Sequence, residues 1–463
     1  NHNIEKKTVY VSHHLSHVFS TLFFNEYNEN SIMLSFDGSG DFSTLESYVI
    51  NRENFKLLEK NTFPHSLGFF YTAFTQFLGF NNYGDEYKFM GLAGYGEPTY
   101  EYKIKKLIKS SYPFRLNLKY FNIPEIDYSN NKPEVCKIYN QNFINLFEID
   151  TKENKEIDFN KKKNIAASVQ KVFEDIVINY LNFYKNKFDA KKIYLTGGCA
   201  LNSSLVGKII RKNIFEEVKV NTNPGDAGGA VGAAFFQSRK LGEKLYDNQE
   251  ISYLGSSYDN KYIEKNIIEK IKNDERFEIF FFKNVSNLIN EATTLIKKNH
   301  LIFWFQGRME WGPRALGNRS ILADPSIKNI KDIINTTIKK RETFRPLAPV
   351  VLEEDANKYF EMYNHKSEYM NKVFIAKSNT IEKFPGAVHV DKTSRVQTVN
   401  SNDNIKLYKL LYLFKQKYGS SILINTSLNI DSPIVNSPED ALKIFQECNI
   451  KDMILNDWII SKK

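Results

Sequence analysis

A repeated order of strand, glycine turn and helix is the feature that most restricts the fold of this chain. Residues 192–196 form an expected strand, Gly197 and Gly198 end it, and a helix is expected over 201–211. The same order recurs over residues 217–237, where a second glycine loop joins a strand to a helix of small residues. Strands that alternate with helices are typical of α/β domains. We therefore predict an α/β fold class.

Hydrophobic periodicity and turn residues predict further elements along the chain. Strands are expected at residues 8–11, 31–36, 42–50, 300–305 and 418–424. Helices are expected at residues 13–24, 69–80, 164–185, 327–339 and 438–446, with Ser12 and Ser437 as N-caps of the first and the last. Residues 100–160 are polar and carry no periodic signal, so we expect an insertion over the core there.

The length of 463 residues exceeds what one ordinary hydrophobic core supports. The polar segment at residues 241–258 separates two α/β regions. We therefore predict two domains, residues 1–250 and residues 251–463.

Composition excludes several classes of protein. The three cysteines, Cys136, Cys199 and Cys448, are far apart, so neither a disulfide framework nor a thiolate metal site is indicated. No apolar run is long enough to span a membrane, no signal segment opens the chain, and we expect a cytoplasmic protein. The formal charge of +9 comes from scattered lysines, which argues against nucleic acid as the partner.

Two histidines suggest a metal site. His13 and His17 lie four residues apart on an expected helix, so both imidazoles project from one face. Neutral imidazole suits Fe, Zn or Mn. A structural or surface role is the alternative that this spacing leaves open. The position after an expected strand favours a ligand site, because α/β sheets place ligands at strand ends.

Two carboxylates follow other strand ends. Asp37 lies in FDGSGD, which is either a hairpin turn over residues 37–41 or a carboxylate at the sheet edge. Asp226 lies in NPGDAGG, where its charge would repel phosphate but would hold a cation that meets phosphate. Together with His13 and His17, these residues form a candidate set of metal ligands.

Arginines and lysines gather in the C-terminal half. Arg308, Arg314 and Arg319 occur in GRMEWGPRALGNRS, and further basic residues follow in KKRETFRPLAP and SRVQT. Guanidinium groups grip phosphate and carboxylate with two hydrogen bonds. Neutral polar residues in INTSLN follow an apolar strand. This density predicts an anionic ligand, and the alternative is structural pairing with nearby glutamates such as Glu310.

At these residues the chain resembles the antibiotic and nodulation-factor O-carbamoyltransferases. The matching runs, in the family's order, include VSHHLSHVFS, SFDGSGD, GDEYKFMGLAGYGEP, YLTGGCALN, NPGDAGGAVGAAF, GRMEWGPRALGNRSILADP, KKRETFRPLAP, HVDKTSRVQTV and INTSLNIDSPIVNSPEDA. They extend over nearly the whole chain.

The resemblance implies a fold and an activity. The N-terminal domain is expected to be actin/hexokinase-like (ASKHA), and the C-terminal domain YrdC-like. The expected reaction uses ATP and carbamoyl phosphate to form carbamoyladenylate, and then carbamoylates a hydroxyl of a small molecule such as a sugar or natural product. Fe²⁺ is the expected metal at the transfer site, and Mg²⁺ is expected with ATP. An oligomer is possible.

The resemblance also implies roles for particular residues. The implied metal ligands are His13, His17, Asp37 and Asp226. The implied adenylate-forming residues are Arg308, Lys339, Arg345, Arg395, Asn425 and Ser427. The implied nucleotide contacts are Gly197, Gly198, Asn202 and Gly225. Glu86, Lys88 and Gly91 fall in a motif expected at the mouth of the transfer site.

One departure and two alternatives remain. Family members carry an opening strand pair with a glycine and serine turn before the HHxxH element, and nothing here corresponds. We expect a truncated sequence rather than a genuinely shortened enzyme, in which one phosphate loop and part of the acceptor pocket would be missing. A tRNA threonylcarbamoyl-transfer enzyme shares the HxxxH element and both folds. A truncated, non-catalytic nucleotide-binding protein is the other alternative.

Overall fold

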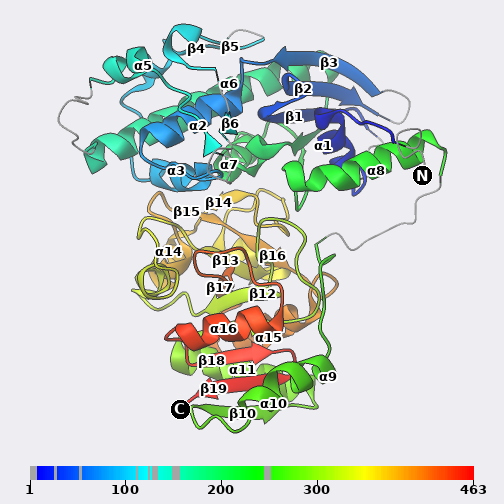
Figure 1. Ribbon diagram of the computed structural model, residues 1–463, viewed down its shortest axis with the longest axis vertical. Helices are drawn as coiled ribbons and strands as arrows, with labels where there is room; N and C mark the ends of the chain where they lie inside the picture. The colour runs from blue at the N-terminus through cyan, green and yellow to red at the C-terminus, as the bar shows by residue number, and fades with distance from the viewer. Residues whose placement is uncertain are drawn as a thin grey trace. The chain divides into compact units, whose positions relative to one another are not determined.

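The computed structural model describes residues 8–25, 29–51, 55–110, 113–123, 126–127, 134–148, 157–243 and 252–463. The chain divides into two compact units, Asn1–Asn248 and Gln249–Lys463 (Figure 1). The predicted boundary between residues 250 and 251 lies outside the described residues. Each unit is a mixed α/β structure with its own sheet.

The N-terminal unit is built on a five-stranded sheet of order β3-β2-β1-β8-β9. The first three strands form two consecutive antiparallel hairpins, and β1, β8 and β9 run parallel to one another. The strands are β1 (Ser31–Gly40), β2 (Ser43–Ile50), β3 (Phe55–Thr62), β8 (Lys192–Thr196) and β9 (Glu217–Val220).

Helices cover both faces of this sheet. On one face, α1 and α8 lie side by side and bury Val18 and Phe235 against Met33 and Tyr194 of the strands (Figure 1). On the other face, α6 donates a hydrogen bond from the Tyr180 hydroxyl to the sheet. The helices of the unit are α1 (His13–Leu22), α2 (Leu67–Phe77), α3 (Glu86–Ala93), α4 (Glu101–Ile104), α5 (Gln141–Leu146), α6 (Phe159–Phe188), α7 (Ser203–Arg211) and α8 (Gly229–Lys240), with short 3-10 turns η2 (Leu118–Tyr120), η3 (Gly198–Leu201) and η4 (Asp226–Gly228).

The segment predicted as an insertion contains short elements of its own. Besides α4, α5 and η2, the described part of residues 100–160 forms three short strand pairs or bridges around an aromatic cluster of Phe74, Phe143 and Phe147. The strands are β4 (Ile108–Lys109), β5 (Arg115–Leu116), β6 (Ile126–Asp127) and β7 (Glu134–Val135).

Two local predictions in this unit were wrong. Residues 8–11 form no strand, and Tyr10 is 92% exposed. The reason is that β-propensity reflects packing within a sheet rather than an intrinsic backbone preference, and residues 8–11 pair with no strand of the described sheet. The hairpin turn also lies later than predicted: β1 continues through Asp37 to Gly40, and Asp41 and Phe42 take the positive φ angles of the turn.

The C-terminal unit contains an eight-stranded sheet of order β10-β19-β18-β11-β12-β17-β13-β16. Most neighbours are antiparallel, and the pairs β11–β18 and β13–β16 are parallel. The strands are β10 (Phe277–Phe281), β11 (Leu301–Phe305), β12 (Arg319–Ala323), β13 (Ala348–Leu352), β16 (Gln397–Val399), β17 (Ile422–Ser427), β18 (Asp452–Leu455) and β19 (Trp458–Lys462), and β14 (Val373–Ile375) pairs separately with β15 (Thr393–Arg395).

Two hydrophobic cores lie on opposite faces of this sheet. One core is formed with α9, η5, α10, α12, η6 and α16, and the other with α11 and α15. The helices are α9 (Asn260–Ile263), η5 (Glu264–Ile268), α10 (Glu269–Ile271), α11 (Val285–Asn299), α12 (Ile330–Asp332), η6 (Ile333–Ile338), η7 (Glu353–Asp355), α13 (Ala356–Tyr359), α14 (Ser378–Lys383), η8 (Pro385–Ala387), α15 (Ile405–Tyr418) and α16 (Pro438–Glu447).

The predictions for this unit and the structure are compared most clearly at the ends of the helices. Ser437 caps α16 in a reciprocal capping box with Asp440, as predicted. The strand expected from residue 418 begins only at Ile422, because α15 extends to Tyr418 and ends at Gly419 in a left-handed conformation. The helix expected at residues 327–339 is shorter, and its second part has the wider π-helical turn.

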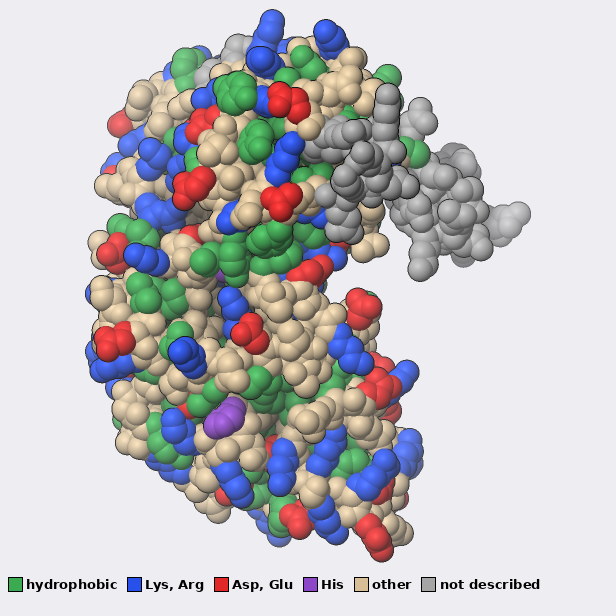
Figure 2. All heavy atoms as spheres, turned by 90° about the vertical axis from the view of Figure 1, so that its left-hand side faces the viewer, with side chains coloured by type: hydrophobic (Ala, Val, Ile, Leu, Met, Phe, Trp, Pro, Cys, Tyr) green, Lys and Arg blue, Asp and Glu red, His purple; other side chains and the backbone are tan. Residues whose placement is uncertain are grey.

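Helix length and surface charge bear on two predictions made from the composition. None of the helices in the described part of the chain combines the length and apolarity needed to cross a bilayer. On the face shown in Figure 2, basic and acidic side chains are interspersed. This distribution agrees with the scattered lysines of the sequence.

Candidate functional site

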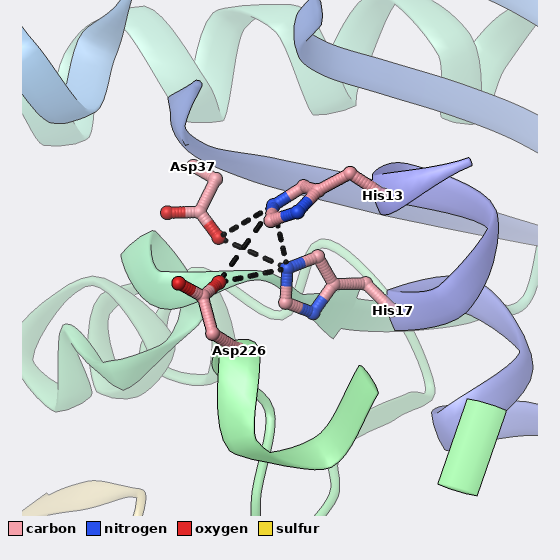
Figure 3. Close-up of side chains that lie close together, drawn as sticks. All are labelled: His13, His17, Asp37 and Asp226. Carbon is pink, nitrogen blue, oxygen red and sulfur yellow. Dashed lines mark hydrogen bonds and ion pairs between the residues drawn. The ribbon is translucent and has the colours of Figure 1, made fainter. Parts of the chain in front are cut away.

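Four predicted ligand residues converge in the N-terminal unit, and we call them the His–Asp cluster. His13, His17, Asp37 and Asp226 each offer one atom, and these atoms lie within 4.8 Å of one another (Figure 3). The two Nε2 atoms of the histidines are 3.0 Å apart. His17 Nε2 lies 3.0 Å from Asp37 Oδ2 and 3.4 Å from Asp226 Oδ1. The corresponding distances from His13 Nε2 are 3.6 Å and 3.7 Å.

The start of α1 is held by the first hairpin. Ser12 occupies the N-cap position, but its side chain makes no capping bond, contrary to the prediction. Instead, the backbone N–H of His13 donates to Asp41 Oδ2 at 2.8 Å. A Cβ atom at Gly40 would lie 2.0 Å from the His13 ring, so only glycine allows this approach. The hairpin therefore fixes where the HxxxH face points.

Asp37 receives its hydrogen bonds from glycine amides. Gly38 N–H donates to Oδ1 at 2.7 Å, and Gly198 N–H donates to Oδ2 at 2.9 Å. Burial disfavours the charged form of this carboxylate. Hydrogen bonds from His13, His17 and the Gly198 amide nevertheless hold the pKa of Asp37 far below its usual range. The glycine turn after β8 therefore binds an anion through a backbone amide, and that anion is the Asp37 carboxylate.

His17 carries the compensating charge of the cluster. Its side chain is 2% exposed, and burial alone would lower its pKa. Hydrogen bonds and charges from Asp226 and Asp37 outweigh that burial and raise the pKa of His17 to about 9. A proton on His17 therefore offsets part of the negative charge of the two carboxylates, as a bound cation would.

The predicted nucleotide contacts form the frame around the cluster. Gly197 has φ +86°, and a Cβ atom there would lie 2.3 Å from the carbonyl oxygen of Phe36. The side chain of Asn202 caps α7 and exchanges hydrogen bonds with Gln170. Gly225 directly precedes Asp226, and a Cβ atom there would lie in ordinary contact, 3.9 Å from the Leu201 side chain. These residues position the loops around the cluster.

A second group of charges lies in the C-terminal unit, and we call it the basic cluster: Arg314, Lys339, Arg341, Arg345 and Arg395. Burial first, and then the charges of Arg341 and Arg345, lower the pKa of Lys339 well below its usual value. Burial and repulsion from Arg314, Arg341 and Arg345 do the same for the Arg395 guanidinium. An anion bound among these like charges would reduce their mutual repulsion.

Polar groups after β17 complete the basic cluster. Lys339 Nζ donates to the carbonyl oxygen and the Oγ of Ser427, and to Asn429 Oδ1 at 2.6 Å. Asn425 is fully buried, and its amide donates to Gln397 Oε1 at 2.7 Å and to the carbonyl of Ala315. Of the predicted residues, Lys339, Arg345, Arg395 and Ser427 belong to this site, and Asn425 supports the loop beside it.

The arginine-rich run from Gly307 to Ser320 has three different environments. Arg308 is exposed, donates to the carbonyls of Leu254 and Gly255, and lines a cavity of about 370 Å³ with Lys406 and Asp457 rather than joining the contacts of the basic cluster. Arg319 is fully buried, with its guanidinium 3.6 Å above the Phe305 ring.

Only Arg314 of that run belongs to the basic cluster. The sequence had marked Arg314 and Arg341 merely as members of a basic stretch, and Asn429 merely as one of the polar residues of INTSLN. The loop itself is organised by the Glu310 carboxylate, which accepts backbone N–H groups of Leu316, Asn318 and Arg319. The predicted alternative was structural pairing of the arginines with nearby glutamates, and the structure shows it for Arg345 with Glu342 at 3.5 Å, whereas Glu310 bonds backbone amides.

Comparison with known proteins identifies the family. The "Carbamoyltransferase N-terminus" family matches residues 2–235, and the "Carbamoyltransferase C-terminus" family matches residues 293–462. The chain therefore belongs to the carbamoyltransferase family and is an enzyme of the transferase class. The predicted resemblance is confirmed at this level.

Named relatives point in the same direction. The nodulation protein NolNO of Sinorhizobium fredii is 34% identical over 98% of this chain and 64% of its own length. An uncharacterized protein of Methanocaldococcus jannaschii is 32% identical over 97% of this chain and 73% of its own length. The 3'-hydroxymethylcephem-O-carbamoyltransferase of Streptomyces clavuligerus is 30% identical over 57% of this chain and 48% of its own length.

Proposed function

We propose that the protein is an O-carbamoyltransferase that works in two steps. The C-terminal unit forms carbamoyladenylate from ATP and carbamoyl phosphate, and the N-terminal unit passes the carbamoyl group to a hydroxyl of a small molecule. The observation that carries the proposal is the basic cluster, whose repelling cations suit ligands with several phosphate charges. The name of the cephem relative supports a hydroxyl acceptor.

The basic cluster supplies the groups that adenylation needs. The reaction consumes water, releases phosphate from carbamoyl phosphate, and joins the resulting carbamate to the α-phosphate of ATP as pyrophosphate leaves. Arg345 and Arg395 offset the phosphate charge that develops. Lys339 holds Ser427 and Asn429 in place through its donors, and the Ser427 hydroxyl donates in turn to Asn429 Oδ1 at 2.6 Å, so these groups form one polar site beside the arginines.

The His–Asp cluster fits a divalent cation. Two nitrogens and two carboxylate oxygens converge, and the carboxylates raise the pKa of His17 to about 9, as negative charge around a cation site does. This donor set suits Fe²⁺, while Mg²⁺ would accompany ATP. Such a cation, when bound, would polarise the carbamoyl carbonyl and offset the charge of the adenylate phosphate.

The remaining parts of the proposal concern fold and nucleotide contacts. We assign the N-terminal unit to the actin-like (ASKHA) class and the C-terminal unit to the YrdC-like class, with residues 1–250 and 251–463 as the domains. Gly198 donates to Asp37 and Gly225 precedes Asp226, and we assign these two glycines, with Gly197 and Asn202 of the loop after β8, to the phosphate of the adenylate.

Pyrophosphate release tests the first step. With ATP, Mg²⁺ and carbamoyl phosphate, the wild-type chain is expected to release pyrophosphate, and Arg395→Ala or Ser427→Ala should reduce the rate by roughly 10²-fold or more, as for the loss of one charge-stabilising group. Lys383→Ala, an exposed lysine at the end of α14, is the matched control. Unchanged release in both site variants would refute the assignment of the basic cluster.

A further inference from the structure

Glu86 is a carboxylate near the His–Asp cluster that the proposed function has not used. It is the first residue of α3, and its side chain is half-buried. The Thr72 hydroxyl of α2 donates to Glu86 Oε1 at 2.6 Å. The adjacent Asp85 is paired with Lys88 at 2.9 Å. Glu86 is therefore oriented by a neutral donor on the neighbouring helix (Figure 1).

The helix that orients Glu86 is itself built against Asp37. Ser66, the N-cap of α2, donates from its hydroxyl to the carbonyl oxygen of Asp37 at 3.0 Å. A Cβ atom at Gly68 would lie 2.7 Å from the Gly38 nitrogen, so this face of α2 touches the chain at Asp37. Thr72 follows Gly68 by four residues and lies on the same face, about 6 Å further along the helix.

The pKa values of two neighbouring groups depend both on the charge of Glu86 and on charges of the His–Asp cluster. Burial first, and then the charges of Asp226, Asp37 and Glu86, raise the pKa of Tyr83. Burial, followed by the charges of Asp37 and Glu86, raises the pKa of the Cys199 thiol. Glu86 nevertheless stands outside the four residues whose ligand atoms converge.

The transfer step needs a proton acceptor that is not a metal ligand. In the proposed function, the free atoms of His13, His17, Asp37 and Asp226 are committed to a cation. Tyr83 keeps its proton because its pKa is raised. A carboxylate beside the cluster that is not one of its ligands is a type of group that performs general base catalysis, and Glu86 is such a carboxylate.

We propose that the Glu86 carboxylate takes the proton of the acceptor hydroxyl during carbamoyl transfer, an inference that rests on the proposed transfer activity. The acceptor oxygen bonds to the carbamoyl carbon, and the bond between that carbon and the phosphate oxygen breaks. AMP leaves with the electron pair, and the hydroxyl proton passes to Glu86. The hydrogen bond from Thr72 fixes one carboxylate oxygen and leaves the other for the acceptor.

The test compares two nucleophiles in single turnovers of the full chain with its metal, ATP and carbamoyl phosphate. Glycerol is the hydroxyl probe, and hydroxylamine is a stronger nucleophile that depends less on a base. Glu86→Gln is expected to slow AMP release with glycerol by roughly 10²-fold or more. AMP release with hydroxylamine, pyrophosphate release and bound metal should stay within about threefold of the wild type, since general base catalysis is the only contribution removed.

Control variants separate this proposal from the proposed function. Glu97→Gln changes an exposed carboxylate and should match the wild type throughout. Unchanged AMP release with glycerol in Glu86→Gln, equal losses with both nucleophiles, or loss of metal would each overturn the role of Glu86. Absence of pyrophosphate release in the wild type would instead refute the proposed function. If Glu86→Gln does not fold, Glu86→Asp must show the same selective loss, and equal reactivity with both nucleophiles would overturn the role.

Discussion

The His–Asp cluster and the basic cluster balance their charges in opposite ways. In the first, two carboxylates face two imidazoles, and the proton on His17 offsets part of their negative charge. In the second, five basic side chains share one neighbourhood, and Arg345 lies 3.5 Å from Glu342. In the proposed function, a cation in the first site would take the place of the His17 proton. A repulsive site gains from any anion that enters.

The largest difference between the clusters should appear in activity. His17→Ala removes a ligand and the charge of the His–Asp cluster, so carbamoyl transfer should fall by about 10³-fold or more, given the several kcal/mol that a metal contributes to such a step. Bound metal, measured by elemental analysis, should fall with it. Pyrophosphate release should persist, because we propose that the basic cluster carries out that step.

His300→Asn is the matched control for this prediction. His300 is exposed and has φ +68°, a conformation that asparagine tolerates. Retention of metal and transfer by His17→Ala would contradict the assignment of the His–Asp cluster.

A smaller effect is expected on stability when the compensation is broken. Asp37→Asn leaves the His17 proton and the Gly198 amide without their carboxylate partner. The free energy of unfolding should fall by about 2 kcal/mol, measured by urea unfolding in the presence of a chelator. Asp189→Asn, at an exposed helix C-cap with φ +46°, should change it little. Equal stability of the two variants would show that the cluster is not held together by charge.

The smallest effect is expected when a repelling cation is removed. Arg395 Nε has no hydrogen-bond partner in the described structure, and its guanidinium faces other cations. Arg395→Met should therefore leave the free energy of unfolding unchanged or raise it by up to about 1 kcal/mol without ligand. Added pyrophosphate should stabilise the wild type more than this variant in a thermal melt. A loss of stability above about 2 kcal/mol would mean that Arg395 is a structural residue.

Local signals predicted much of the fold. Strand β8 was predicted over its full length, and β9, α7 and α8 were predicted to within a few residues, because periodic apolar positions and glycines mark them. Ser437 was also predicted correctly as the N-cap of α16. The strand at residues 8–11 was not correct, since an apolar run does not show whether a neighbouring strand edge is open.

The candidate sites divide in the same way. The four-residue spacing of His13 and His17 determines by itself that both imidazoles share a helix face. Their meeting with Asp37 and Asp226 depends on crossings between elements that are distant in sequence, and the sequence alone did not reveal that Gly198 would bind Asp37. The proposed role of Glu86 likewise depends on the packing of α2 against β1.

The arginine-rich run shows most clearly what each level decides. The sequence by itself determined that three arginines lie in one short, glycine-containing segment, residues 307–320. Only the tertiary structure decided that Arg308 faces outward, Arg314 joins the basic cluster and Arg319 is buried over Phe305. The physical reason is that this segment has no helical or strand periodicity to orient side chains. Its path is set by the Glu310 carboxylate and its backbone amides, which meet only in the folded chain.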